Sequence, residues 1–186
     1  MPDTVQSPFS KKEKFIIKNN NLYDNASSKP ALLIKNVTLF DIFQNSIYWV
    51  SKDNALYQSD LSGKNPTQIF DSFYNPIKNI KISPDGQKVL YYNDYEIMYS
   101  WLGDKSFKKI FLNRFSDKIG DAFWLNNDYV IFTLVGKIKI SESDNINEIN
   151  IVELPQTADK IYFSQQNKKL YIQTRKETLV SEQLTQ

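Results

Sequence analysis

The chain of 186 residues is 41% hydrophobic and 14% aromatic, which is sufficient for one sizeable packed core. It contains neither cysteine nor histidine, so disulfides, thiol nucleophiles, Ser-His-Asp triads and zinc sites with sulfur or imidazole ligands are excluded. The net charge is only +2, and Arg114 and Arg175 are the two arginines. This balance argues against nucleic-acid binding, because base recognition depends heavily on arginine. Aspartate and glutamate leave open a carboxylate enzyme or an oxygen-ligand metal site.

The N-terminal residues 1–12 are polar and include two prolines, so they are expected to form a flexible tail. The short basic cluster at 11–14 is interpreted as a solvated part of that region. The next stretch, residues 15–36, repeats the pattern of residues 48–71. It therefore predicts the later strands of a repeated unit whose first strand is missing.

Residues 78–101 carry the strongest strand signal. Short runs of β-branched and aromatic residues predict one strand ending at Ser83, one over 87–92 and one over 95–101. Pro84 and Gly86 predict a tight turn between the first two, because proline presets a negative φ and glycine accepts a positive one. No apolar run in the sequence approaches the length of a membrane span.

Three sets of apolar residues recur along the chain at spacings of 40 or 41. The sets are Ile42, Ile82, Phe123 and Phe163; Trp49, Val89, Val130 and Leu170; and Leu56, Ile97, Ile138 and Leu179. A polar turn separates the first two sets each time. A period near forty that is built from hairpins is typical of β-propeller blades. An antiparallel sandwich is the alternative fold, but the matched columns favour the propeller.

The sequence thus predicts an all-β chain with a β-propeller domain of about four blades over residues 13–184, forming a partial or small ring. The blades are expected at 13–36, 37–71, 77–112, 118–154 and 159–184, of which the first and last are partial, and Pro155 is expected to end the fourth range. Two interpretations of the ends follow. Either Ala31–Lys35 completes the last blade of a small ring, or the chain is the C-terminal part of a larger propeller whose preceding blades are missing. The partial first blade favours the second interpretation.

Three groups of residues are candidate sites. The first is an aromatic set that matches a sugar- or peptide-stacking platform: Tyr91, Tyr92, Tyr95, Tyr99 and Trp101. Every blade carries aromatics at similar places, which favours ordinary strand packing. Asp85, Asp94 and Glu96 are candidate carboxylates, although Asp85 and Asp94 fit turn positions better. The acidic loop 141–148 offers oxygen ligands but lacks the register of a calcium loop. No metal, cofactor or catalytic residue is predicted.

Two segments carry a resemblance to known proteins. Residues 82–92, ISPDGQKVLYY, resemble the repeat of TolB-type and WD-repeat-like bacterial propellers. Residues 111–144, followed by KKLYIQT at 168–174, are similar to the C-terminal propeller half of PEGA-domain-containing proteins of candidate-phylum bacteria. This resemblance implies a domain outside the cytoplasmic membrane, tethered through an N-terminal region that this chain lacks. It implies no catalytic motif.

The predicted function is therefore that of a non-catalytic protein-interaction or scaffold domain within a larger bacterial envelope protein. Its partner would be an unknown protein or a cell-envelope polymer, and not a nucleic acid. The candidate contact residues lie in the turns that recur at one place in each repeat, at Asn45, Asp85, Asn127 and Gln166. The alternative is an accessory or catalytic propeller of a glycan- or peptide-processing enzyme that uses carboxylates.

Overall fold

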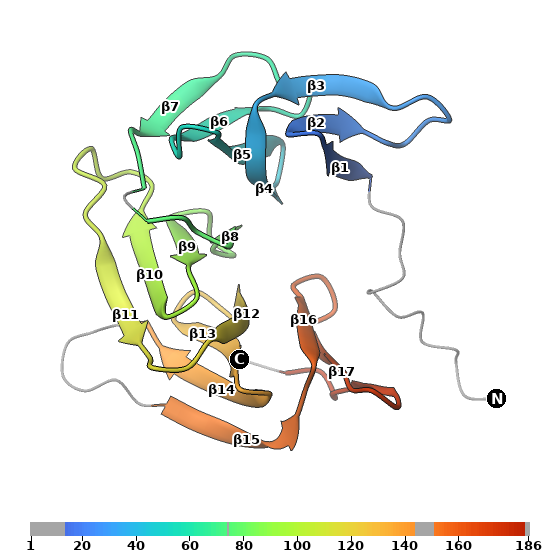
Figure 1. Ribbon diagram of the computed structural model, residues 1–186, viewed down its shortest axis with the longest axis vertical. Helices are drawn as coiled ribbons and strands as arrows, with labels where there is room; N and C mark the ends of the chain where they lie inside the picture. The colour runs from blue at the N-terminus through green and yellow to red at the C-terminus, as the bar shows by residue number, and fades with distance from the viewer. Residues whose placement is uncertain (1–13, 74, 144–150, 185–186) are drawn as a thin grey trace. The chain divides into compact units, whose positions relative to one another are not determined.

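The computed structural model describes residues 14–73, 75–143 and 151–184, and every regular element in these ranges is a β-strand. The strands form five antiparallel sheets, three of which have four strands (Figure 1). The predicted all-β class is confirmed. The predicted tail at 1–12 and residues 144–148 of the acidic loop lie outside the described residues. Within the described ranges there is no helix with the length and apolar character needed to cross a membrane.

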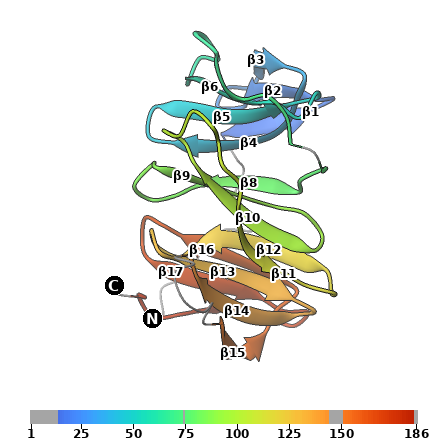
Figure 2. The same cartoon turned by 90° about the vertical axis from the view of Figure 1, so that its left-hand side faces the viewer.

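The five sheets follow one another along the chain, and we name them A to E. Sheet A contains β1 (Phe15–Lys18), β2 (Asn21–Asp24) and β3 (Ala31–Lys35). Sheet B contains β4 (Val37–Phe43), β5 (Ser46–Ser51), β6 (Leu56–Asp60) and β7 (Thr67–Phe70). Sheet C contains β8 (Asn79–Ile82), β9 (Lys88–Tyr92), β10 (Glu96–Trp101) and β11 (Ile110–Arg114). Sheet D contains β12 (Ile119–Trp124), β13 (Tyr129–Leu134), β14 (Lys137–Glu142) and β15 (Ile151–Thr157), and sheet E contains β16 (Lys160–Ser164), β17 (Lys169–Gln173) and β18 (Thr178–Val180). The strands of each sheet lie side by side in chain order, as Figure 2 shows for β13, β14 and β15.

Turn residues explain where the strands end. Asn19 and Asn20 both have positive φ, at 51° and 56°, and join β1 to β2. Asparagine tolerates this left-handed region, so the pair forms the kind of two-residue hairpin whose twist matches the strands. Gly86 has φ 74° in the turn after β8. The strands predicted around it are confirmed as β8, β9 and β10.

The described residues form two compact units. One contains residues 14–93 and 98–110, and the other contains residues 94–97, 111–143 and 151–184. The first unit has two apolar clusters. One joins sheets A and B around Leu22, Val37 and Ile47, and the other joins sheet B to β8–β10 around Leu56, Ile80 and Tyr91. In the second unit, one face of sheet D packs on sheet E through Ile131, Ile138, Ile161, Phe163 and Ile172.

The four residues of the second recurring set, Trp49, Val89, Val130 and Leu170, are all buried. Their registers nevertheless differ. Val89 lies opposite Ile82, whereas Trp49 lies opposite Phe40 and not opposite Ile42. The reason is the loop between the strands, since Phe43 and Ser46 pair directly and leave room for two residues only. Equal spacing in the sequence therefore identifies the core position without fixing its cross-strand partner.

Strand β15 differs from its predicted end. It runs through Pro155 to Thr157, although Pro155 was expected to close that blade. The physical reason is its position at the outer edge of sheet D, where a strand has one unpaired side and a residue without an N–H is tolerated. The predicted limits of the domain itself remain a prediction.

Candidate interaction surface

The four predicted contact residues all lie in the turn after the first strand of a four-stranded sheet or of sheet E. Asn45, Asp85 and Gln166 are exposed, and Asn127 is half-buried. In the first unit, a Cβ on Gly86 would lie 2.4 Å from the Phe43 ring, so the turn of β8–β9 packs closely beside the end of β4. The β8–β9 turn thus contributes to packing between neighbouring sheets, and a role of the four turn residues in binding a partner stays a prediction.

The Asp85 carboxylate forms hydrogen bonds within its own turn. Its carboxylate accepts hydrogen bonds from the Ser83 hydroxyl at 2.6 Å and from the Gln87 amide at 3.0 Å. Burial by itself raises the pKa of the Asp85 carboxyl, but these hydrogen bonds, together with the positive charge of Lys88, outweigh that effect and lower it. These contacts therefore support the interpretation of Asp85 as a turn residue.

The connections between the third and fourth strands use aspartate in the same way. Asp60 accepts hydrogen bonds from the Ser62 hydroxyl at 2.6 Å and from the Lys64 amide at 2.9 Å. Asp104 accepts hydrogen bonds from the hydroxyl and the amide of Ser106. In each case the serine hydroxyl is the largest influence and lowers the pKa of the carboxyl. These aspartates shape loops, since hydrogen bonding to a carboxylate stabilises its charged form.

The first strands of the sheets carry a set of contacts that the sequence interpretation missed. Asp41 on β4 accepts a hydrogen bond from the Ile82 amide at 2.8 Å and pairs with the Lys81 ammonium at 3.0 Å, both from β8. In the second unit, Asp121 on β12 accepts a hydrogen bond from the Ile161 amide of β16 at 3.4 Å. Each carboxylate thus satisfies a backbone donor of the next sheet's first strand. The available signal was the 40-residue spacing of Asp41, Lys81, Asp121 and Ile161.

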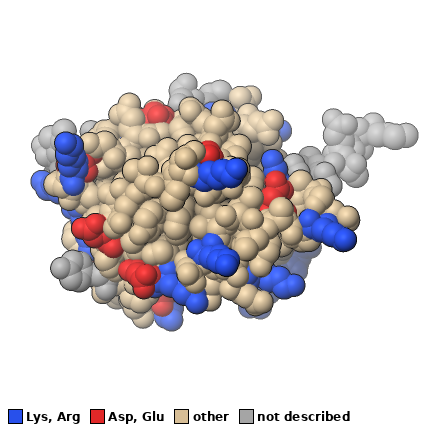
Figure 3. Space-filling model, turned by 90° about the horizontal axis from the view of Figure 1, so that it is seen from above, with Lys and Arg blue, Asp and Glu red and all other residues tan. Residues whose placement is uncertain are grey.

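The other two candidate carboxylates form ion pairs within the second unit. Glu96 is nearly buried and accepts hydrogen bonds from Nε and Nη2 of Arg114. Asp94 lies 3.2 Å from the Lys118 ammonium, and this pair is exposed. Asp94 and Glu96 thus each pair with a cation of their own, and the described residues contain no cluster of three acidic side chains suited to a metal ion. Figure 3 shows charges of both signs interspersed over the face it presents.

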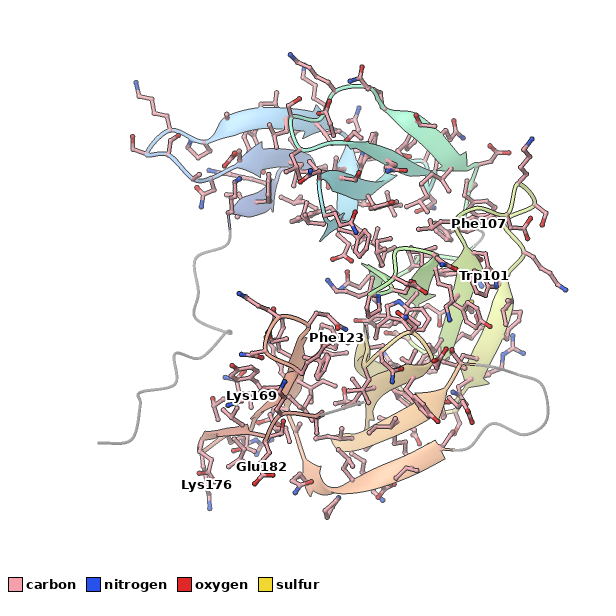
Figure 4. All side chains as sticks on the ribbon, turned by 180° about the vertical axis from the view of Figure 1, so that it is seen from behind. Trp101, Phe107, Phe123, Lys169, Lys176 and Glu182 are labelled. Atoms are coloured by element: carbon pink, nitrogen blue, oxygen red, sulfur yellow. The ribbon has the colours of Figure 1, made fainter. Side chains whose placement is uncertain are left out.

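The aromatic set of sheet C divides into core and surface. Tyr91, Tyr92 and Tyr99 are buried, whereas Tyr95 and Trp101 are exposed. Within the first unit, the Lys88 ammonium lies 5.0 Å from the centroid of the Trp101 ring. Trp101 is labelled in Figure 4. The expectation of ordinary strand packing therefore holds for three of the five rings. A single exposed ring with a cation beside it has the geometry of a cation–π contact.

The most distinctive surface lies in the second unit, at the outer side of sheets D and E. In sheet D a cross-strand row runs from Phe123 through Ile131 and Ile140 to Val152. Cross-strand neighbours share a face of the sheet, and this is the face that packs on sheet E. Val152, at the outer end of the row, is 58% exposed.

The matching row of sheet E runs from Ile161 through Ile172 to Leu179. Ile161 and Ile172 are buried against sheet D, but Leu179 is 37% exposed. Both rows thus become solvent-exposed toward the outside. Leu179 lies on β18, the outermost strand of sheet E, and among the described residues no strand pairs with its other edge. We call the side chains of Val152 and Leu179 together with this edge of β18 the open edge.

The open edge was absent from the sequence prediction, which placed candidate contacts in turns. The third recurring set includes Leu179, because Leu56, Ile97, Ile138 and Leu179 share one spacing in the sequence, although Leu56 faces the following sheet and Leu179 faces the preceding one. The first three are fully buried and Leu179 is not. The sequence equates the four positions but does not show what covers each of them.

Comparisons with known proteins define the fold alone. Neither a protein-family model nor a curated protein sequence matches the chain. Among solved structures, the dihydro-heme d1 dehydrogenase NirN in complex with DHE matches at 15% identity with a TM-score of 0.57, over 87% of this chain and 39% of that chain. A chain of the nidogen/laminin complex matches at 13% identity with a TM-score of 0.57, over 85% of this chain and 64% of that chain.

Both matches are to β-propellers, and this chain spans less than two thirds of the length of either. Identities below 20% transfer neither an activity nor a ligand. Together with the repeated four-stranded antiparallel sheets, the comparisons show that the chain has a β-propeller fold.

Proposed function

We propose that this β-propeller is a non-catalytic protein-interaction or scaffold domain. The observation that carries the proposal is the open edge, where Leu179 exposes an apolar side chain at the unpaired edge of β18 and Val152 exposes another at the outer end of the row that packs on sheet E. Apolar surface of this kind is costly to leave in water, and a contiguous patch typically marks a contact site. The matched propeller of the nidogen/laminin structure belongs to a protein complex, and we extend that use of the fold to this chain.

The finer assignment is also a proposal. The residues at 82–92 and 111–144 support a relation to TolB-type propellers and to the propeller half of PEGA-domain-containing bacterial proteins. On that basis we propose that the domain lies outside the cytoplasmic membrane and is tethered to it. The test is protease accessibility in intact cells of the source bacterium. Cleavage of the tagged domain without lysis supports this location, and protection until lysis contradicts it.

The contacts of the candidate carboxylates do not support the enzyme alternative. Asp85 is held within its turn, and Asp94 and Glu96 pair with Lys118 and Arg114. A general acid or base must reach a substrate proton, whereas each of these groups is already bound to a neighbour. We therefore propose binding, and not catalysis, as the function.

Site-specific photo-crosslinking tests the proposal. A photoreactive amino acid replaces Val152, and a matched control replaces Val135, which is 71% exposed in the turn between β13 and β14. The proposal expects one dominant adduct from position 152, and the purified partner then binds the unmodified domain in a direct titration. Equal adducts from both positions, or no binding by the purified partner, would overturn it.

A further inference from the structure

Resting on the proposed interaction function, we infer that the open edge binds an extended segment of a partner protein as a fourth antiparallel strand along β18. Such strand addition joins the partner's backbone to an exposed sheet edge and uses pockets for alternate side chains. The inference goes beyond a general contact surface, because it specifies the conformation, direction and side-chain pattern of the bound segment.

The other sheets show what occupies the equivalent place. In sheet B the fourth strand, β7, lies antiparallel to β6, with Phe70 opposite Leu56 and Thr67 opposite Gln58. In sheet D the fourth strand, β15, lies antiparallel to β14, with Val152 opposite Ile140. Sheet E has its third strand, β18, in the same relation to β17. The chain itself therefore provides the template for a strand beside β18.

The exposure of Leu179 shows how much apolar surface a fourth strand in sheet E could cover. Leu56 belongs to the row Leu39, Val50, Leu56 and Phe70, and it is fully buried. Leu179 shares the repeat position of Leu56 in the sequence and also lies on the third strand of its sheet, but its row faces the preceding sheet, D, whereas the row of Leu56 faces the following sheet, C; Leu179 keeps 37% of its surface exposed. A fourth strand that placed an apolar side chain opposite Leu179, as Phe70 lies opposite Leu56, would cover that surface.

The edge of β18 has one of the usual protections against pairing, a length of only three residues, and lacks the others. Natural sheet edges are blunted by proline, lysine or bulges. The outer strand of sheet D carries Pro155 and a shift of register between Lys137 and Lys139 in its pairing. Strand β18 reads Thr-Leu-Val and carries none of these residues. Its edge is therefore chemically suited to pair with another strand.

The ladder to β17 shows which backbone groups point outward. The Ser181 amide donates to the Leu170 carbonyl at 2.9 Å. Residues of an antiparallel strand alternate between bonding the neighbour on one side and the neighbour on the other. The adjacent Val180 therefore directs its N–H and C=O away from β17, toward the open side. This makes Val180 the residue whose backbone would bond the partner strand.

Charges at the two ends of β18 set the direction of the partner segment. Arg175 and Lys176 precede the strand, with the exposed Glu177 between them and Thr178, and the exposed Glu182 follows the strand; Lys176 and Glu182 are labelled in Figure 4. A strand antiparallel to β18 brings its C-terminal end toward the basic pair. We therefore expect a partner segment with alternating apolar residues, an acidic residue near its C-terminal end and no acidic residue near Glu182.

A peptide copied from the chain provides the probe. Residues 65–72, NPTQIFDS, contain the fourth strand of sheet B followed by Asp71. With Phe70 opposite Leu179, Asp71 of the peptide lies toward Arg175 and Lys176. A fluorescein-labelled peptide of this sequence is titrated with the full chain and followed by anisotropy. The control peptide carries N-methyl groups at alternate residues, which remove the backbone donors facing β18 and leave the side chains unchanged.

Two variants separate the strand mechanism from simple apolar contact. Val180→Pro removes the outward N–H and should weaken peptide binding about tenfold, as expected for the loss of one hydrogen bond at the upper end of its range. Val135→Ser alters an exposed apolar residue elsewhere and should leave binding unchanged. Thermal melts confirm that each variant is folded. The N-methylated peptide should bind at least as weakly as the normal peptide binds Val180→Pro.

Three results would overturn strand addition. The first is equal binding of the normal and N-methylated peptides. The second is a concentration-dependent dimer that Val180→Pro abolishes, since it would assign the edge to a second copy of the chain. The third is a partner, captured through position 152, that binds Val180→Pro with unchanged affinity. That last result would leave the proposed interaction function unaffected. If neither the peptide nor the captured partner binds, both the strand-addition inference and the proposed interaction function are contradicted.

Discussion

The outer sides of the two units differ in how far their apolar side chains are covered. In the first unit, Phe70 of β7 stacks on Phe107 with ring centroids 4.3 Å apart, and Phe73 contacts both rings. Phe73 and Phe107 are buried, and Phe107 lies in the segment after β10. In the second unit the equivalent outer positions, at Val152 and Leu179, remain exposed. A fourth strand and an aromatic plug thus complete the packing of sheets B and C, whereas sheet E offers an apolar strand edge.

The repeat determines where an apolar residue lies, but the neighbours of that residue determine whether it belongs to the core or to a contact surface. Leu56 and Leu179 share one repeat position in the sequence, but Leu56 faces the following sheet and is covered, whereas Leu179 faces the preceding sheet and is partly exposed. Transfer of apolar surface from water stabilises by about 25 cal/mol per Å². That gain is already realised at Leu56, and at Leu179 it becomes available only when another strand binds.

The largest effect is expected from a charge in the core of the second unit. Val130 is fully buried at the centre of sheet D, and Val130→Asp would place a carboxylate there without a partner. We expect a loss of about 4 kcal/mol or more, sufficient to unfold much of the unit. Circular dichroism melts measure it. A melting transition equal to that of the wild type would contradict the assigned core of sheet D.

The comparison itself is tested by truncating the two leucines that share one repeat position in the sequence. Leu56→Ala is expected to destabilise by about 2–5 kcal/mol because it creates a cavity in a closed core. Leu179→Ala should cost less than about 1 kcal/mol, since the side chain is already partly in water. Urea denaturation followed by tryptophan fluorescence measures both. Similar losses for the two variants would show that the open edge is in fact closed.

A smaller difference is expected between the two aspartates that join neighbouring first strands. Asp41 bonds both the Ile82 amide and the Lys81 ammonium, whereas Asp121 accepts a longer bond from Ile161. Asp41→Ala should cost about 1–3 kcal/mol and Asp121→Ala about 0.5–1.5 kcal/mol. Denaturation midpoints of the two variants provide the measurement. A larger loss at Asp121 would reverse the ranking that these contacts predict.

The smallest effect is expected at Asp85, and it depends on pH. The folded pKa of this carboxyl lies below its unfolded value, so its stabilisation is complete above about pH 4 and is lost as the pH falls through the folded value. Asp85→Ala should therefore cost about 1 kcal/mol at pH 7 and progressively less below about pH 4. Melts across this range measure the difference. A difference independent of pH would assign the effect to the turn's shape and not to its charge.

The sequence predicted the strands and the buried positions well where local signals suffice. The runs around Pro84 and Gly86 predicted β8 to β10, and the second recurring set predicted four buried residues. It could not predict that Trp49 lies opposite Phe40, because this depends on a loop of two residues. It also missed the role of Asp41, because a contact between neighbouring sheets depends on how they pack.

The candidate site was predicted less well, for a related reason. Asn45, Asp85, Asn127 and Gln166 were chosen because turns recur and are exposed, but exposure alone does not distinguish a contact from a solvated turn. The open edge depends on what covers Leu179, and a sequence column cannot show a missing neighbour. Only the comparison of equivalent strands within the fold reveals it.

Hydrogen exchange at β18 tests the open edge most directly. The measurement compares the amide of Val180 with amides of β14, the equivalent third strand of sheet D, in the full chain with and without the peptide of residues 65–72. The account predicts rapid exchange at Val180 in the free protein, slow exchange in the middle of β14, and protection of Val180 when the peptide is bound. Protection of Val180 in the free protein equal to that in β14 would contradict it, because the edge would already be paired.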